Sequence, residues 1–81
     1  MIPKNAIAED MNKITIQVNG ESMQVTAEVK SVADLIEKLN LSHRRFFIIE
    51  KNRTVISPEN YKVETVSADD CFEIVHFVGG G

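Results

Sequence analysis

The chain has little of several features that mark specialised classes of protein. Its 81 residues include one cysteine and no tryptophan, and no apolar run approaches the length of a signal peptide or a membrane span. A single cysteine excludes an intramolecular disulfide, so the domain needs no oxidising compartment in order to fold. These absences predict a cytoplasmic protein that does not enter a membrane.

The chain also lacks an excess of basic charge. Nine lysine and arginine residues stand against twelve aspartate and glutamate residues, which gives a formal net charge of −3. A nucleic-acid binder needs a concentrated basic face, and the longest basic cluster, residues 43–45, is too short to provide one. We therefore expect no nucleic-acid partner.

The length allows one small domain. A domain of this size buries only roughly 60% of the surface that its unfolded chain exposes. A catalytic cleft is hard to build within so small a core, because each positioned side chain needs packed neighbours of its own. The size favours a binding or carrier role over an enzyme.

Two segments near the start predict an antiparallel hairpin. Apolar and polar residues alternate over residues 13–18 and again over residues 23–27, which is the period of a strand with one buried face. Asn19 and Gly20 lie between them, and this pair tolerates the positive φ angles of a tight turn. We expect residues 1–10, which precede the hairpin and have no sustained period, to be a flexible extension.

One amphipathic helix follows the hairpin. Ser31 stands three residues before Asp34, a variant of the capping box, and the helix is expected to end near Asn40. Its apolar stripe is formed by Val32, Leu35, Ile36 and Leu39. This spacing is typical of a helix that lies on a sheet, and we expect Leu41 to pack back against the same core.

The second half of the chain predicts further strands. Residues 46–49 and 54–56 read as strands, residues 57–60 as a loop or single helical turn, and residues 61–66 as a segment along the sheet edge. Residues 71–78 are almost continuously apolar, which suits a strand in the middle of a sheet. The order of elements predicts an α+β domain over residues 11–78, with one helix on one face of a mixed sheet.

The last strand predicts a surface for binding a partner. If Phe72 and Ile74 face the helix, then Val75 and Phe77 face away from it. With Phe47 they would form an exposed apolar patch, and such patches are often interfaces. The alternative is that both sheet faces are covered and all three are core residues.

No catalytic or metal site is predicted. Cys71 and His76 lie five residues apart on one strand and therefore point to opposite faces, so they cannot form a nucleophile and base pair. Two histidines and one cysteine without close spacing are too few for structural zinc.

The chain ends in Gly79, Gly80 and Gly81. Glycine has no side chain to pack, so we expect these residues to form a flexible tail that could thread a narrow channel and present its carboxylate to a partner. Taken alone, the glycines fit a frayed terminus equally well.

The tail and the strand before it resemble the C-terminus of the thiamine-biosynthesis sulfur carrier family, ThiS. The resemblance covers residues 11–81 and is most specific at Gly80 and Gly81. It also includes the Asn19-Gly20 turn, the helix over residues 31–39, the segments 48–52 and 55–56, Tyr61, and the acidic turn Asp69-Asp70.

The resemblance implies a β-grasp, ubiquitin-like fold in which the last strand lies parallel to the first. It implies that a ThiF-type enzyme uses ATP and Mg²⁺ to adenylate the carboxylate of Gly81, while the carrier itself binds no cofactor. A persulfide donor would then convert Gly81 to a thiocarboxylate, which would pass its sulfur to thiazole synthase. In this scheme the chain is a co-substrate of its partner enzymes.

Three alternatives remain open from the sequence. The small subunit of molybdopterin synthase shares the implied fold and chemistry, although its tail usually approaches the glycine pair through a proline, where this chain has Val-His-Phe-Val. A ubiquitin-like modifier would join its terminal carboxylate to lysines of target proteins. A plain interaction module would not need Gly80 and Gly81.

Overall fold

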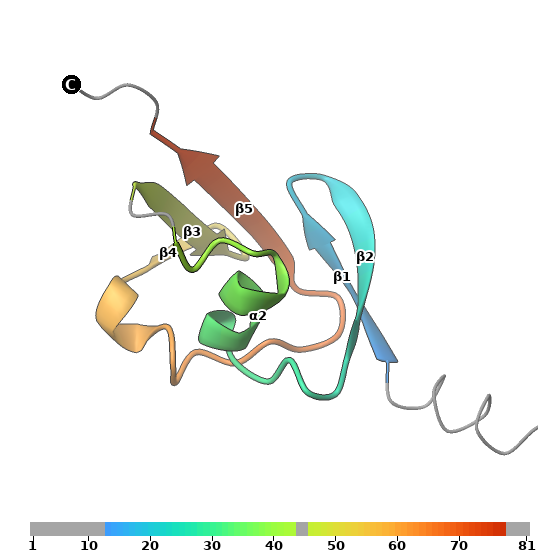
Figure 1. Ribbon diagram of the computed structural model, residues 1–81. Coiled ribbons are helices and arrows are strands. Elements are labelled where there is room, and N and C mark those ends of the chain that lie inside the picture. Colours follow the sequence, from blue (N-terminus) through green and yellow to red (C-terminus); the bar gives the residue numbers. More distant parts are fainter. Residues whose placement is uncertain (1–12, 44–45, 78–81) are drawn as a thin grey trace, which may run out of the picture.

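The computed structural model describes residues 13–43 and 46–77. Within them the chain forms one mixed sheet of order β2-β1-β5-β3-β4, with a single α-helix lying across one face (Figure 1). The elements are β1 (Lys13–Val18), β2 (Glu21–Thr26), α2 (Val32–Lys38), β3 (Phe47–Lys51), β4 (Thr54–Ile56), the short 3-10 helix η1 (Pro58–Asn60) and β5 (Cys71–His76). Among these residues no helix has the length and apolar character needed to cross a bilayer.

The predicted hairpin is confirmed. β1 and β2 pair antiparallel, and Asn19 and Gly20 connect them with φ angles of 51° and 83°. Positive φ at both positions gives a turn whose twist matches that of the two strands. Ile16 and Val25 point toward the helix and are fully buried there.

Specific hydrogen bonds cap both ends of the helix. The Asp34 N–H donates to Ser31 Oγ over 3.2 Å, and Asp34 Oδ2 accepts the Ser31 N–H over 3.0 Å, so the predicted capping box is present. The helix ends at Lys38, slightly before the expected position, because Asn40 takes a positive φ of 61°. The Leu41 N–H then donates to the Ile36 carbonyl over 2.9 Å, a Schellman ending that turns Leu41 onto the core as predicted.

The last strand occupies the centre of the sheet, as its apolar sequence predicts. β5 pairs parallel with β1, where Gln17 is opposite Cys71, and antiparallel with β3, where Ile49 is opposite Ile74. Regular pairing ends at His76, Phe77 follows the strand, and Val78, the last residue of the predicted strand, lies beyond the described residues.

The segment after η1 does not run along the sheet edge as predicted. It lies against the first turn of α2, where the Val32 N–H donates to the Glu64 carbonyl and the Ala33 N–H to the Tyr61 carbonyl, both over 2.8 Å. The first N–H groups of a helix have no partner within the helix. This segment satisfies two of them, and these bonds hold it beside the start of the helix.

The acidic turn before β5 is fixed by a small polar network. Asp70 is buried and its carboxylate accepts from the Ser67 N–H over 2.8 Å and from Asn52 Nδ2 over 3.0 Å. The Asn52 Oδ1 in turn accepts the Cys71 N–H over 2.9 Å. These bonds set the position at which the chain enters β5.

Candidate functional site

The structure positions the strand that leads to the predicted functional carboxylate. Gly79, Gly80 and Gly81 lie outside the described residues, and Phe77 is the last residue that the structure describes. The Phe77 N–H donates to the Phe46 carbonyl over 2.9 Å, one step beyond the end of β5. The chain is therefore held by the sheet to within four residues of Gly81.

The side chains of β5 alternate between the two faces as predicted. Phe72 and Ile74 point toward α2 and are buried, whereas Val75 points to the face that α2 does not cover and is exposed. Phe77 continues this alternation and is also exposed. The uncovered face thus carries hydrophobic side chains next to the start of the tail.

The pairing of β5 with β3, and of β3 with β4, shows which residues of the neighbouring strands continue this exposed surface. Ile48 is opposite Val75, Val55 is opposite Glu50 on the same face, and Phe46 is bonded to Phe77. We call the five residues the open-face patch: Phe46, Ile48, Val55, Val75 and Phe77. Four of them expose much of their surface, with fractions of 70% for Phe46, 58% for Val55, 49% for Val75 and 54% for Phe77.

Phe47 does not belong to this patch, and its predicted place there is wrong. It is opposite His76, and its side chain packs on the helix side of the sheet against the core. Its ring stacks on that of Tyr61 with centroids 6.4 Å apart, and meets the ring of His76 edge-on at 6.1 Å. The apolar position on the open face is Ile48, one residue further along β3.

Besides Ile48, the sequence also failed to indicate Phe46 and Val55, for different reasons. Phe46 precedes the regular part of β3, and only its bond to Phe77 places it beside the strand end. Val55 lies in a strand of three residues, in which Ile56 is buried and Val55 is exposed. Three residues are too few for their alternation to indicate which face is inward.

The other half of the uncovered face is polar. Thr15 and Gln17 of β1 stand opposite Gln24 and Ser22 of β2, and all four are exposed on the side away from α2. The hydrophobic side chains of the open face therefore gather over the end of β5 and its neighbours in β3 and β4, beside the opposed Glu50 and Glu73, while the hairpin side is polar.

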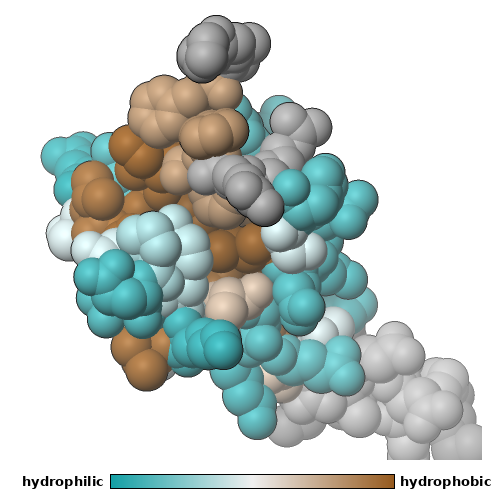
Figure 2. Space-filling view, turned by 60° about the vertical axis from the view of Figure 1, so that its left-hand side comes forward, coloured by the Kyte–Doolittle hydropathy of each residue, from teal (hydrophilic) through white to brown (hydrophobic). Residues whose placement is uncertain are grey.

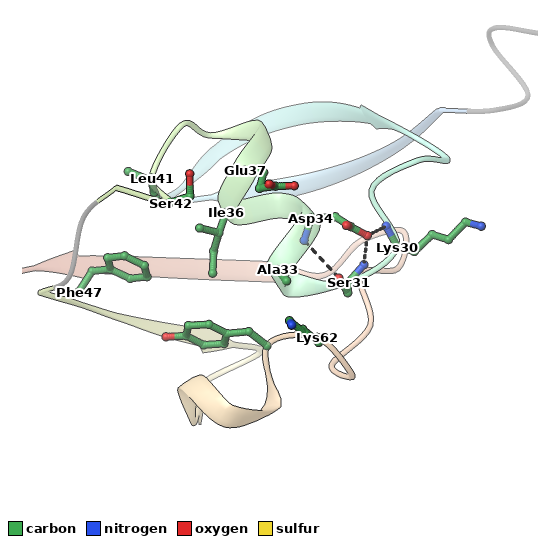
Figure 3. A pocket seen from close by; sticks show the side chains of 11 residues that line it. Lys30, Ser31, Ala33, Asp34, Ile36, Glu37, Leu41, Ser42, Phe47 and Lys62 are labelled. Carbon is green, nitrogen blue, oxygen red and sulfur yellow. Dashed lines mark hydrogen bonds between the residues drawn. The ribbon is translucent and has the colours of Figure 1, made fainter.

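A second apolar surface lies on the helix side. A groove of about 760 Å³ runs between α2 and the ring pair of Phe47 and Tyr61, with Ile36 and Leu41 also lining it. Ile36 and Ala33 point downward from the helix, with Phe47 to their left and Lys62 below Ala33 (Figure 3). Figure 2, turned toward the side of β3 and β4, shows hydrophobic surface gathered in one area with hydrophilic side chains around it.

The polar groups at one end of this groove serve the fold. Backbone N–H groups of Lys30 and Ser31 hold the pKa of the Asp34 carboxyl below its usual value, and both bonds belong to the helix cap. Burial raises the pKa of the Tyr61 hydroxyl. Neither group is paired with a nucleophile, so the groove offers a shape for packing and no arrangement for acid-base chemistry.

Cys71 and His76 lie apart, on opposite faces of β5. The Cys71 thiol is 3.7 Å from Gln17 Oε1 on the uncovered face, while the His76 ring contacts Phe47 on the helix side. They cannot act together as nucleophile and base. Among the described residues the candidate site is therefore an exposed surface beside the end of β5.

Comparison with known proteins identifies the family. The sequence model of the ThiS family matches residues 11–81, which is nearly the whole chain. This chain belongs to the ThiS family. It is 33% identical over 66 residues to the sulfur carrier protein ThiS of Bacillus subtilis (strain 168), covering 82% of this chain and 98% of that protein.

A solved ThiS structure supports the same assignment at the level of the fold. The crystal structure of thiamine biosynthesis protein ThiS from Geobacter metallireducens matches with a TM-score of 0.72 and 28% identity, over 84% of this chain and 100% of that one. The mixed five-stranded sheet with one helix is thus the β-grasp fold that the resemblance implied. The matches favour the thiamine branch over a molybdopterin synthase subunit or a ubiquitin-like modifier.

Proposed function

We propose that the carboxylate of Gly81 is the group on which this protein carries sulfur. As a member of the ThiS family the chain is a sulfur carrier of thiamine biosynthesis, and such a carrier works with enzyme partners. The observation that carries the proposal is the course of β5, a central strand held through Phe77 that leads toward Gly81. Four further residues reach at most about 14 Å, enough to enter a partner's active site.

The chemistry that we propose begins with activation of this carboxylate. A carboxylate is a poor electrophile at neutral pH, so a ThiF-type enzyme joins it to the α-phosphate of ATP and releases pyrophosphate. Mg²⁺ held by that enzyme would supply neutralisation of the charge on the phosphates. The carrier contributes the carboxylate as a co-substrate and holds neither ATP nor metal.

Sulfur enters in the second step. The terminal sulfur of a cysteine persulfide attacks the acyl carbon and AMP leaves, which forms an acyl disulfide between carrier and donor. A second thiol then reduces the sulfur–sulfur bond, so that a thiocarboxylate remains on Gly81 and the donor is oxidised to a disulfide. We place these steps in the cytoplasm, where thiols are kept reduced, and propose thiazole synthase as the acceptor of the sulfur.

We further propose that the open-face patch is where the adenylating enzyme docks. It joins aromatic and aliphatic side chains into one exposed surface beside the strand end, and aromatic residues are enriched in binding hot spots. A partner held there by Val75 and Phe77 would be adjacent to the tail.

Intact-protein mass spectrometry tests the proposed function. After incubation with the cognate adenylating enzyme, Mg-ATP, a persulfide donor and a thiol reductant, the carrier should gain the mass difference of one oxygen-to-sulfur replacement, located on Gly81 by fragmentation. A carrier that lacks Gly81 is the control and should gain nothing. An unchanged mass with an enzyme that activates its own authentic carrier would refute the proposal.

The docking surface is tested by charge substitution. Phe77→Asp should lower the rate of carrier-dependent ATP–pyrophosphate exchange by roughly tenfold or more, because it places a carboxylate in an apolar contact. Val63→Asp is a matched control, since Val63 is 73% exposed in the segment after η1 and lies outside the patch. Equal exchange rates for both variants, with the fold intact, would exclude the patch.

A further inference from the structure

The C-terminal half of β5, residues 74–76, forms backbone–backbone hydrogen bonds only with β3. Every second residue of β5 directs its backbone N–H and carbonyl groups toward β3. The Asn52 N–H donates to the Cys71 carbonyl at one end of this pairing, and the Phe77 N–H donates to the Phe46 carbonyl at the other. Between them lie Ile74 and His76, whose backbone groups point the opposite way, toward β1.

On that side β1 is too short to pair with the whole of β5. It ends at Val18, and the last bonds come from the turn residue Asn19, whose N–H donates to the Phe72 carbonyl over 2.9 Å. The Asn19 side chain then replaces a missing strand residue, because its Oδ1 accepts the Ile74 N–H over 2.7 Å. Beyond this point the hairpin turns away from β5 (Figure 1).

Three backbone groups of β5 consequently have no hydrogen-bond partner among the described residues. Among the described residues the Ile74 carbonyl and both the N–H and the carbonyl of His76 have no backbone or side-chain partner. They follow one another along one edge of the strand, in the spacing that an additional strand would satisfy. The edge adjoins Phe77 and therefore lies directly before the tail.

We propose that an extended segment of the adenylating enzyme adds to this edge as an extra strand in the β-sheet, beside β5 and beyond the Asn19-Gly20 turn. The proposal rests on the proposed function, since that enzyme must bind the chain next to Gly81. The chemistry of the site specifies a peptide backbone that supplies a carbonyl to the His76 N–H and N–H groups to the two free carbonyls.

The surroundings of the edge suit a strand better than a side chain. The ring of His76 is turned to the helix side and packs edge-on against Phe47, so it leaves the edge itself unobstructed. Val75 and Phe77 are exposed on the open face beside the edge, where they can contact side chains of the added strand. Such pairing would keep β5 extended past His76 and would aim the last four residues into the active site.

Amide hydrogen exchange measured by NMR tests this pairing at single residues. In the carrier alone, the His76 amide should exchange about tenfold or more faster than the amides of Val75 and Phe77, which bond to β3. With saturating adenylating enzyme and no ATP, exchange at His76 should slow by about tenfold or more. Unchanged exchange at His76, while the Val75 methyl signals shift on binding, would overturn the inference and leave the proposed function standing.

Failure of the proposed function would look different. If the adenylating enzyme neither shifts the Val75 methyl signals nor adenylates the carrier, both proposals fall together. Slow exchange at His76 in the carrier alone would overturn the inference by itself, because the edge would already be paired.

A pair of substitutions gives a second readout. His76→Pro removes the outward N–H, which no described residue uses, and proline is tolerated at strand edges whose N–H is unpaired. His76→Ala removes the ring and keeps the N–H. We expect His76→Pro to raise the KM for the carrier in pyrophosphate exchange by about tenfold relative to His76→Ala with kcat little changed. Equal KM values in two folded variants would contradict the added strand.

Discussion

At the scale of single residues, the turns depend on side chains that accept left-handed backbone. Asn19, Asn40 and Asn52 all have positive φ angles, and asparagine is among the residues that tolerate them best. Arg53 is the exception, with φ of 73° in the two-residue turn between β3 and β4. Its long side chain gains nothing from that conformation, so strain remains at this position.

Arg53→Gly is therefore expected to stabilise the protein by about 0.5–1 kcal/mol, since glycine adopts this φ without steric cost and Asn-Gly is a favoured pair for such turns. Urea unfolding measures the change. Arg53→Ala is the matched control, because it removes the same charge and keeps the strain. A gain of equal size in both variants would mean that charge and not backbone strain is responsible.

Asp34 links the helix cap to pH. The backbone N–H groups of Lys30 and then Ser31 lower the pKa of its carboxyl in the folded protein, so its ionised form stabilises the fold. This contribution is complete above the unfolded pKa of about 3.9 and is lost as pH falls through the lower folded pKa.

Asp34→Asn should therefore be less stable than the wild type at neutral pH, and the difference should shrink as pH falls below about 4. Denaturant unfolding at a series of pH values measures it. Glu37→Gln, at an exposed position of the same helix, tests whether loss of any helix carboxylate is enough. A difference between wild type and Asp34→Asn that stays constant down to pH 2 would contradict this account.

At the scale of elements, β5 depends on one side chain of the preceding turn. Asn19 Oδ1 accepts the partly buried Ile74 N–H, and thereby extends the pairing of β1 with β5 by one bond. Asn19→Gly keeps the backbone conformation of the turn and leaves that N–H unpaired, which should cost about 1–2 kcal/mol in unfolding free energy. Asn19→Asp retains the acceptor and should lose less. Wild-type stability of Asn19→Gly would show that the bond contributes nothing.

The elements also differ in how far the sequence predicted them. Strict alternation over β1 and β2 assigned both strands and their buried faces, and Ser31 with Asp34 marked the start of the helix. The apolar run of residues 46–49 has no such period, so its buried side could not be assigned, and Phe47 was placed on the wrong face. Only the register with β5, which joins residues far apart in sequence, decides that question.

The same limit explains the segment after η1. Its backbone satisfies N–H groups at the start of α2, a requirement that arises only once helix and segment are brought together. For the candidate site, the sequence indicated that Val75 and Phe77 face away from the helix, while the predicted tail lies outside the described residues. The remaining patch residues and the unpaired edge of β5 follow from strand pairing and strand length, which local patterns do not encode.

At the scale of the whole molecule, the adjacent residues Phe46 and Phe47 lie on opposite faces of the sheet. Phe46 is exposed in the open-face patch, whereas Phe47 packs on the core beside Tyr61. Phe47→Ala should therefore destabilise the fold by about 2 kcal/mol, while Phe46→Ala should change stability by less than about 0.5 kcal/mol.

In affinity for the adenylating enzyme, we expect the order of the two variants to be reversed. Phe46→Ala is expected to weaken association with the adenylating enzyme, and Phe47→Ala, studied at a temperature where it remains folded, should retain it. Thermal unfolding and titration calorimetry measure the two quantities. Loss of binding in Phe47→Ala alone would instead point to the groove on the helix side.

The central position of β5 also governs how the molecule assembles. The hairpin of β1 and β2 and the hairpin of β3 and β4 share no strand pairing until β5 inserts between them, and Cys71 lies 54 residues from its contact with Gln17. A ribosome delivers β5 after every other strand, so the sheet closes late and in one cooperative step. Chains truncated before this strand should remain open and be degraded, which would leave few folded carriers that lack the strand leading to the tail.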